Sequence, residues 1–264
     1  MPYNYDLCFK TPQNRWIFVP TSECRDNGYE YVKLIRRKWT LPNFYYHLKA
    51  GGHIAALKLH EGNNYFAKID IKSFFPSISK AKVIRALKDI GINYKLAELI
   101  ASWSTVKSKE NSTKYIVPYG FVQSQIIASL CLDKSAIGSF IKNKLPTDVK
   151  VSVYVDDIIL SSNNPSALQD IYNQIIATFD KTGFTVNTEK SHEVLDQTTT
   201  FNIVMNAEDM QITEDRFTDF ESAITPLNIK RSEAIINYVS SVCSIQSETL
   251  KEQLKSMIDN SKCA

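Results

Sequence analysis

The stretch VSVYVDDIILSS, residues 151–162, decides the fold, because two adjacent aspartates interrupt a run of apolar and β-branched residues. Such a run predicts two strand halves joined at Asp156 and Asp157. Burying one carboxylate without a partner costs several kcal/mol, and two neighbouring carboxylates also repel each other. No Lys or Arg occurs between Val151 and Ser162. The pair therefore needs a positive charge that comes from outside this stretch.

Magnesium meets this need, because it prefers oxygen ligands and is usually held by one or two carboxylates plus substrate phosphates. A site for two ions would require a further carboxylate from a different strand. The best candidate is Asp70 in AKIDIKSFF, which also lies inside a strand-like apolar stretch. The two strands must then be neighbours in one sheet. The alternative is that Asp156 and Asp157 are ordinary turn residues, since Asp is common in turns.

The overall composition is that of a folded protein. With 264 residues, 44% of them hydrophobic, the chain can bury a core as one large domain or as two to three subdomains. Its net charge of +3 is too small to establish a nucleic-acid partner. The scattered cysteines favour reduced thiols over a zinc site or a disulfide frame; they are Cys8, Cys24, Cys131, Cys243 and Cys263. No apolar run approaches the ~20 residues of a membrane span, and the N-terminal segment does not resemble a signal peptide, so we expect a cytoplasmic protein without a membrane partner.

Hydrophobic periodicity and turn residues outline the remaining elements. The expected elements are a hairpin turning at Asp26-Asn27-Gly28, a strand at 65–71, a helix at 79–91, one long helix at 124–145, a helix at 164–183, a strand at 184–187 and helices after Thr213. This order predicts an α+β fold, with helices on one face of a sheet.

Four blocks, in the same order along the chain, resemble reverse transcriptases. FAKIDIKSFFPSI resembles the block with the first metal-binding aspartate, and VPYGFVQSQIIASL resembles the next, which supports template and incoming nucleotide. YVDD resembles the family's signature hairpin, and GFTVNTEKS resembles the block whose lysine approaches the nucleotide phosphates. TTTFNIVMN matches the primer-gripping hairpin weakly. The upstream segment FYYHLKAGGHIAALKLH is most similar to bacterial abortive-infection and defence-associated enzymes related to retron reverse transcriptases.

The resemblance implies a right-hand polymerase with fingers, a ferredoxin-like antiparallel palm and a small helical thumb. The expected division is 1–65 fingers, 66–118 palm strand with the first metal aspartate plus fingers helices, 119–212 palm and 213–264 thumb. The implied activity is that of an RNA-directed DNA polymerase, a nucleotidyltransferase that joins dNTPs by two-metal phosphoryl transfer. The implied partners are an RNA template, a DNA product, and a non-coding RNA or a second protein encoded nearby. The implied role is antiphage defence.

The resemblance also assigns roles to individual residues. Two Mg²⁺ ions would be held by Asp70, Asp156, Asp157 and the carbonyl of Ile71. The expected nucleotide-binding residues are Phe75, Tyr119, Gly120, Gln123, Lys190, Lys33 and Arg36. The Phe75 ring would pack beneath the sugar and exclude a 2′-hydroxyl, while Phe74 would point into the core. Lys33 and Arg36 would grip phosphates from the fingers, the alternative being a solvated strand edge.

The chain departs from the family pattern in its second block. Tyr119 stands where the family usually has glutamine, Gln125 stands where proline is usual, and Gln123 stands where a small residue is common. These changes leave untemplated or protein-primed synthesis as an alternative, and a non-catalytic nucleic-acid-binding relative as another. The intact aspartates argue against loss of activity. An RNA-directed RNA polymerase would usually show Gly-Asp-Asp, which is absent here.

Overall fold

The computed structural model describes residues 3–262. Its centre is a four-stranded antiparallel sheet in the order β6-β7-β3-β8. The strands are β3 (Tyr65–Asp70), β6 (Lys150–Tyr154), β7 (Asp157–Ser162) and β8 (His192–Leu195). In the register of β3 and β7, Asp70 lies directly opposite Asp157. The expectation that the strands carrying the aspartates are neighbours is therefore confirmed.

The two faces of the sheet pack against different cores, because successive residues of a strand point to opposite sides. Ala67, Ile69 and Ile158 belong to the larger core, together with residues of α7 (Pro165–Phe179). Phe66 and Ile159 belong to a second core that continues into the C-terminal helices. Asp70 shares the face of Phe66, since the two residues lie four positions apart on β3.

A small second sheet leads from the centre to the C-terminal helices. It consists of β9 (Thr198–Thr200), β10 (Ile203–Met205) and β11 (Met210–Ile212). The turn between β9 and β10 places Phe201 and Asn202 at positive φ, 56° and 59°. The chain then forms α8 (Glu214–Ala223), α9 (Ile229–Ser240) and α10 (Ser244–Lys262), which confirms the helices expected after Thr213.

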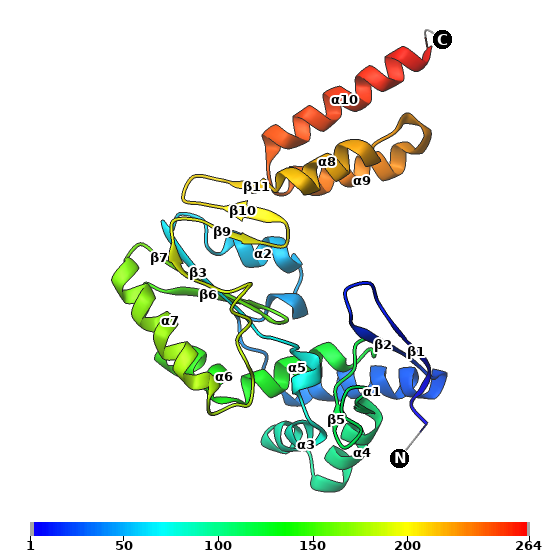
Figure 1. The fold of residues 1–264 in the computed structure, drawn as a ribbon, viewed down its shortest axis with the longest axis vertical. Helices are drawn as coiled ribbons and strands as arrows, with labels where there is room; N and C mark the ends of the chain where they lie inside the picture. The colour runs from blue at the N-terminus through cyan, green and yellow to red at the C-terminus, as the bar shows by residue number, and fades with distance from the viewer. Residues whose placement is uncertain (1–2, 263–264) are drawn as a thin grey trace.

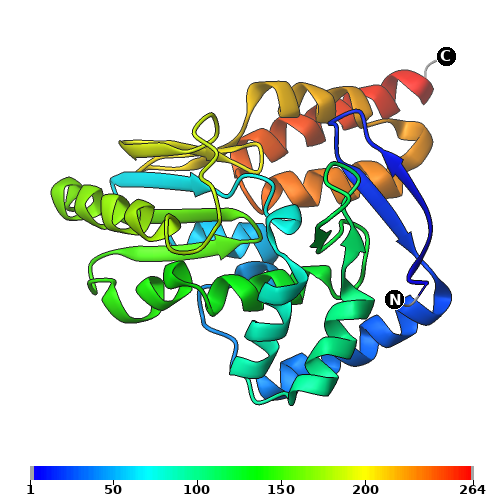
Figure 2. The ribbon, with the colours of Figure 1, turned by 60° about the horizontal axis from the view of Figure 1, so that its bottom comes forward.

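Two further groups of elements surround the sheet. The N-terminal group consists of β1 (Tyr5–Lys10), β2 (Trp16–Pro20), α1 (Ser22–Lys38) and α2 (Gly52–Lys58). The group after β3 consists of α3 (Lys80–Asp89), α4 (Tyr94–Ser104), β4 (Val106–Lys107) and β5 (Tyr115–Ile116). Figure 1 places α8–α10 at one end of the molecule and α1, α3 and α4 at the other, with the four-stranded sheet between them. Figure 2 shows the same two groups of helices at the top and the bottom of the view, with the sheet to the left. The boundaries expected for fingers, palm and thumb stay predictions.

The hairpin expected at Asp26-Asn27-Gly28 is wrong, because these residues lie inside helix α1. The Thr21 side chain caps this helix by accepting a hydrogen bond from the backbone N–H of Cys24 at 3.0 Å. Gly28 serves packing rather than a turn: a Cβ there would lie 2.4 Å from Oε1 of Gln123. The turn-like tripeptide is thus overridden by the helical spacing of the buried residues, which are Cys24, Gly28, Tyr31 and Ile35.

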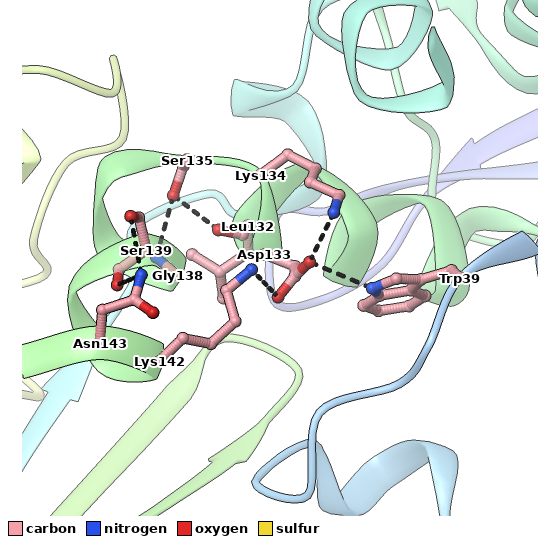
Figure 3. A network of polar contacts seen from close by, with 9 residues as sticks. All are labelled: Trp39, Leu132, Asp133, Lys134, Ser135, Gly138, Ser139, Lys142 and Asn143. Carbon is pink, nitrogen blue, oxygen red and sulfur yellow. Dashed lines mark hydrogen bonds and ion pairs between the residues drawn. The ribbon is translucent and has the colours of Figure 1, made fainter. Parts of the chain in front are cut away.

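The single helix expected over 124–145 is also wrong, since the chain forms α5 (Ser124–Asp133) and α6 (Ala136–Lys144). Asp133, the last residue of α5, is almost fully buried, and its carboxylate contacts side chains at the C-cap of α1 and on α6 (Figure 3). Its carboxylate accepts a hydrogen bond from Nε1 of Trp39 at 3.1 Å and pairs with Nζ of Lys142 at 3.0 Å. A buried carboxylate needs such partners, so the network fixes where α5 ends.

The start of α6 packs closely against the end of α5. Ser135 caps α6, its hydroxyl accepting a hydrogen bond from the backbone N–H of Gly138 at 3.4 Å. A Cβ at Gly138 would lie 2.4 Å from the carbonyl oxygen of Leu132. Only glycine lets the two backbones approach this closely.

Candidate active site

Asp70 and Asp156 meet at one end of the four-stranded sheet. Asp70 is the last residue of β3, and Asp156 lies in the turn between β6 and β7, where Val155 has a φ of 59°. The backbone N–H of Ile71 donates to the carbonyl oxygen of Asp156 at 3.0 Å, which holds the two segments together. Both aspartates and Ile71 line a cavity of about 360 Å³. The predicted proximity of these residues is therefore observed.

The segment after Gly183 supports Asp70 from the other side. The Asn187 N–H donates to the Asp70 carbonyl oxygen at 2.9 Å, and the Asp70 N–H donates to the Ser191 hydroxyl at 2.9 Å. The strand expected at 184–187 is reduced to an isolated bridge between Ile71 and Val186. Its backbone is used to hold the Asp70 loop rather than to extend the sheet.

Burial and crowding of carboxylates disfavour the ionised form of Asp156. Burial, then the nearby carboxylates of Asp157 and Asp70, raise the pKa of Asp156 to about 6. Within residues 3–262 no three acidic, histidine or cysteine side chains are gathered so as to hold a metal ion by themselves. Two carboxylates beside an open cavity nevertheless fit Mg²⁺, which takes its remaining ligands from water and substrate phosphates. The donor set thus fits a divalent ion that binds together with a nucleotide.

Asp157 behaves differently from its neighbours. It does not belong to the lining of the cavity. Its Oδ1 lies 3.1 Å from Nζ of Lys68, and both side chains are largely buried. Burial raises the pKa of Asp157, while Lys68 acts in the opposite direction. The structure therefore brings Asp157 to a lysine rather than to the cavity.

Four exposed cationic side chains stand around the cavity: Arg15, Lys72, Lys109 and Lys190. Lys190 is the lysine that the sequence predicted near the nucleotide phosphates. The other three were missed. Lys72 could have been predicted from the sequence, because it lies only two residues after Asp70. Arg15 and Lys109 reach the cavity from the β1–β2 turn and from the loop after β4, which only the tertiary fold reveals.

Lys33 and Arg36, expected to contact phosphates, do not line this cavity. Both lie on helix α1, so the strand edge considered for them is wrong. Lys33 pairs with Glu30 at 2.7 Å on the exposed side of the helix. Arg36 borders a different, smaller pocket beside Trp39.

Aromatic rings form one wall of the cavity. Tyr119 lines it, and its ring lies edge-on to Phe75 with 4.9 Å between ring centroids. The guanidinium of Arg15 lies 5.7 Å from the centre of the Tyr119 ring. Phe75 is 8% exposed and Phe74 is 1% exposed. Phe74 is thus in the core as expected, and Phe75 lies under Tyr119 rather than in the cavity lining.

Gly120 and Gln123, both expected at the nucleotide, shape the loop without lining the cavity. Gly120 has a φ of +104°, and a Cβ there would lie 2.2 Å from the carbonyl oxygen of Phe18. Gln123 is buried, and its Nε2 donates to the carbonyl oxygen of Trp103 at 3.3 Å. Gly120 therefore acts on the position of its neighbour Tyr119, and Gln123 anchors the start of α5 to the end of α4.

A second groove lies beside the YVDD hairpin. The rings of Tyr154 and Phe201 have centroids 4.9 Å apart, and Nε2 of His53 lies 3.1 Å from the hydroxyl of Tyr238. A pocket of about 540 Å³ is bordered by Phe201, Tyr238 and the cationic side chains of Arg216 and Arg231. The hairpin that the sequence matched weakly to a primer grip thus lies beside the β6–β7 turn that carries Asp156.

Comparison with known proteins agrees with this geometry. The profile of the family described as reverse transcriptase (RNA-dependent DNA polymerase) matches residues 10–222. The retron Ec73 reverse transcriptase of Escherichia coli is 27% identical over 203 residues, which cover 72% of this chain and 63% of that protein. The chain therefore spans less than two thirds of the length of this relative. No helix within residues 3–262 is long and apolar enough to cross a membrane.

Solved structures with the same fold include viral and telomeric polymerases. The foamy viral protease-reverse transcriptase in complex with double-stranded DNA is 18% identical, with a TM-score of 0.52 over 95% of this chain and 42% of that chain. Telomerase from Candida albicans, bound to a fragment of telomeric RNA, is 11% identical, with a TM-score of 0.54 over 98% of this chain and 58% of that chain. Apo telomerase from Candida tropicalis is 13% identical, with a TM-score of 0.55 over 97% and 57% of the two chains. These likenesses show the shared α+β polymerase fold.

Proposed function

Since the chain belongs to the reverse transcriptase family, we propose that it is an RNA-directed DNA polymerase that adds dNTPs to a primer. The observation that carries the proposal is the pair Asp70 and Asp156 in the wall of one cavity. Four cationic side chains also line this cavity, whose volume is about 360 Å³. Paired carboxylates facing cations are what a two-metal phosphoryl transfer requires.

The family uses divalent metal ions, and we propose two Mg²⁺ ions at this site. Asp70, Asp156 and the Ile71 carbonyl would hold them. When bound, the ions would lower the pKa of the primer 3′-hydroxyl and neutralise the triphosphate. Lys72 and Lys190 would orient the triphosphate, and Lys190 would pair with the leaving pyrophosphate. In phosphoryl transfer, catalysis comes almost entirely from holding the reacting groups in line and from stabilising the developing charge.

We assign the choice of sugar to two rings. Tyr119 contacts the space that the nucleotide would fill, and Phe75 supports it from below. A 2′-hydroxyl would have to displace packed rings, which is unfavourable in a dense site. The pair would thus exclude ribonucleotides by repulsion.

We assign the groove at Phe201 and Tyr238 to the primer–template duplex. Its aromatic rings can pack against sugars and bases, and Arg216 and Arg231 can neutralise phosphates. The similarity to a retron enzyme supports a structured non-coding RNA as template. It also supports a role in antiphage defence in the bacterial cytoplasm. A second protein encoded nearby is a further candidate partner.

The test begins with the purified protein and the nucleic acid bound to it. We expect sequencing of that nucleic acid to reveal a discrete RNA, and we expect incubation with dNTPs and Mg²⁺ to extend a primer with DNA complementary to it. DNA of a sequence unrelated to any template would favour the untemplated alternative. The proposal fails if no polymer forms with any RNA, any neighbouring gene product or any dNTP mixture.

A further inference from the structure

Lys68 is a buried cation in contact with the catalytic hairpin. It lies two residues before Asp70 on β3, so both side chains emerge on the same face of the sheet. The residue is 8% exposed, and its Nζ lies 3.1 Å from Oδ1 of Asp157. The same ammonium donates to the carbonyl oxygen of Thr199 on β9 at 3.5 Å. One side chain thus connects the catalytic sheet with the β9–β10 hairpin.

The other groups near Lys68 do not replace Asp157 as its partner. His192 lies opposite Lys68 in the register of β3 and β8. Burial, and to a smaller extent Lys68, lower the pKa of His192, so its imidazole is neutral near pH 7. Its Nε2 is engaged with the Thr198 hydroxyl at 2.8 Å. Asp70 also faces this side of the sheet, but it lines the cavity.

The ion pair decides which carboxylates face the cavity. Removing one partner of a buried pair leaves the other charge uncompensated, which is strongly unfavourable. Asp157 is therefore held toward Lys68, and it is absent from the cavity lining that contains Asp70 and Asp156. Lys68 also contacts Thr199 on β9. Phe201, which follows β9, packs its ring against Tyr154 of the hairpin that carries Asp156 and Asp157.

We propose that Lys68 is a positioning residue that engages Asp157, so that Asp70 and Asp156 alone supply the carboxylate ligands for the metal ions. Through Thr199, Lys68 also fixes the β9–β10 hairpin relative to the catalytic turn. This inference rests on the proposed function, because it assigns roles within the same site. It narrows the expected ligand set of three aspartates to two.

The test is a double-mutant cycle of Lys68→Met and Asp157→Asn on the full chain. The readouts are the unfolding midpoint of the metal-free protein and Mg²⁺ binding by calorimetry. Lys68→Met should lower the midpoint and tighten Mg²⁺ binding several-fold, because it releases the negative charge of Asp157 toward the site. Adding Asp157→Asn should reverse both effects. Lys68→Arg, which keeps the charge, should leave Mg²⁺ affinity near that of the wild type.

Lys142→Met is the matched control, since Lys142 also pairs with a buried aspartate, Asp133, away from the cavity. It should lower the midpoint without changing Mg²⁺ affinity. The inference is overturned if Lys68→Met leaves Mg²⁺ binding unchanged, or if Asp157→Asn alone weakens it as much as Asp156→Asn. Neither readout depends on polymerisation. An inactive wild type that shows the expected cycle would refute the proposed activity and leave the ion pair standing.

Discussion

At the scale of single residues, Asp156 carries the clearest electrostatic signature. Burial and the neighbouring carboxylates raise its pKa to about 6 from the ordinary value of 3.8. The folded protein therefore holds this proton more tightly than the unfolded chain does. The stability that this group contributes is present below pH 3.8 and is lost as the pH rises through about 6.

Asp156→Asn should consequently stabilise the metal-free protein at pH 7, by on the order of 1–3 kcal/mol. The gain should shrink as the pH falls from 6 toward 4, because wild-type Asp156 is then protonated as well. Urea unfolding of both proteins across this pH range measures the difference. Equal stabilities at pH 7 would show that Asp156 is not desolvated.

Phe75 and Phe74 make a matched pair for testing sugar selection. Phe75→Ala removes the support beneath Tyr119 and should raise the ratio of rNTP to dNTP incorporation. Phe74→Ala should leave the ratio unchanged, although truncating either buried ring should destabilise the fold by ~3–5 kcal/mol. Competitive incorporation and chemical unfolding separate the two effects. Equal incorporation of rNTPs and dNTPs by the wild type would contradict the assignment of sugar selection to these rings.

The residues that the sequence could place are those inside ordered motifs. Asp70 and Asp156 were found because an acidic residue in an apolar strand has few structural explanations. Arg15 and Lys109 were missed because they lie in surface loops without a recognisable motif, and only the fold brings those loops to the cavity. The partner of Asp157 was also missed, although Lys68 stands in the same quoted block as Asp70.

At the scale of elements, the loop of Tyr119 is fixed by its approach to β2. The Phe18 N–H donates to the carbonyl oxygen of Tyr119 at 3.0 Å, and Gly120 follows in the left-handed region. Gly120→Ala should weaken the fold by more than the ~1–2 kcal/mol expected for positive φ alone. It should also raise the KM for dNTPs, since Tyr119 would move.

Gly62→Ala is the control for this prediction. Gly62 also has a positive φ, +80°, but a Cβ there would meet nothing within 4 Å. It should show the backbone strain without the clash and without a change in KM. Equal losses of unfolding free energy for the two variants would show that the contact with β2 is unimportant.

The elements that the sequence failed to predict share a physical cause. Local turn chemistry at Asp26-Asn27-Gly28 was outweighed by burial along α1. The break between α5 and α6 depends on Asp133 and its distant partner Trp39. Both outcomes are set by tertiary contacts that local patterns do not contain. Helices with clear caps, such as α3 with Ser79 at its start, were predictable.

At the scale of the whole molecule, the proposed duplex site lies between the β6–β7 turn and the C-terminal helices. Arg231 is exposed on α9 and borders the groove. Arg231→Ala should weaken binding of a primer–template duplex and reduce the slope of log affinity against log salt by about 1. Arg25→Ala, which changes an exposed residue on α1, is the matched control. Fluorescence anisotropy at several salt concentrations measures both, and identical slopes would place the duplex elsewhere.

The overall architecture was predictable because four blocks in a fixed order define the four-stranded sheet and the elements around it. The arrangement of the segments on either side of these blocks was less predictable from the sequence. The placement of the β1–β2 hairpin and of α1 follows from long-range packing that the N-terminal residues do not reveal on their own.

Cys263 lies outside the described residues, and the four described cysteines are free thiols as expected.

The measurement that tests the central claim most directly is primer extension on a defined RNA template with dNTPs and Mg²⁺. Wild type is compared with Asp70→Asn, Asp156→Asn and Asp170→Asn, the last being an exposed residue on α7. We predict complementary DNA from wild type and Asp170→Asn, and a loss of several orders of magnitude in rate for the other two, with all four proteins folded. Comparable synthesis by Asp70→Asn or Asp156→Asn would contradict the account.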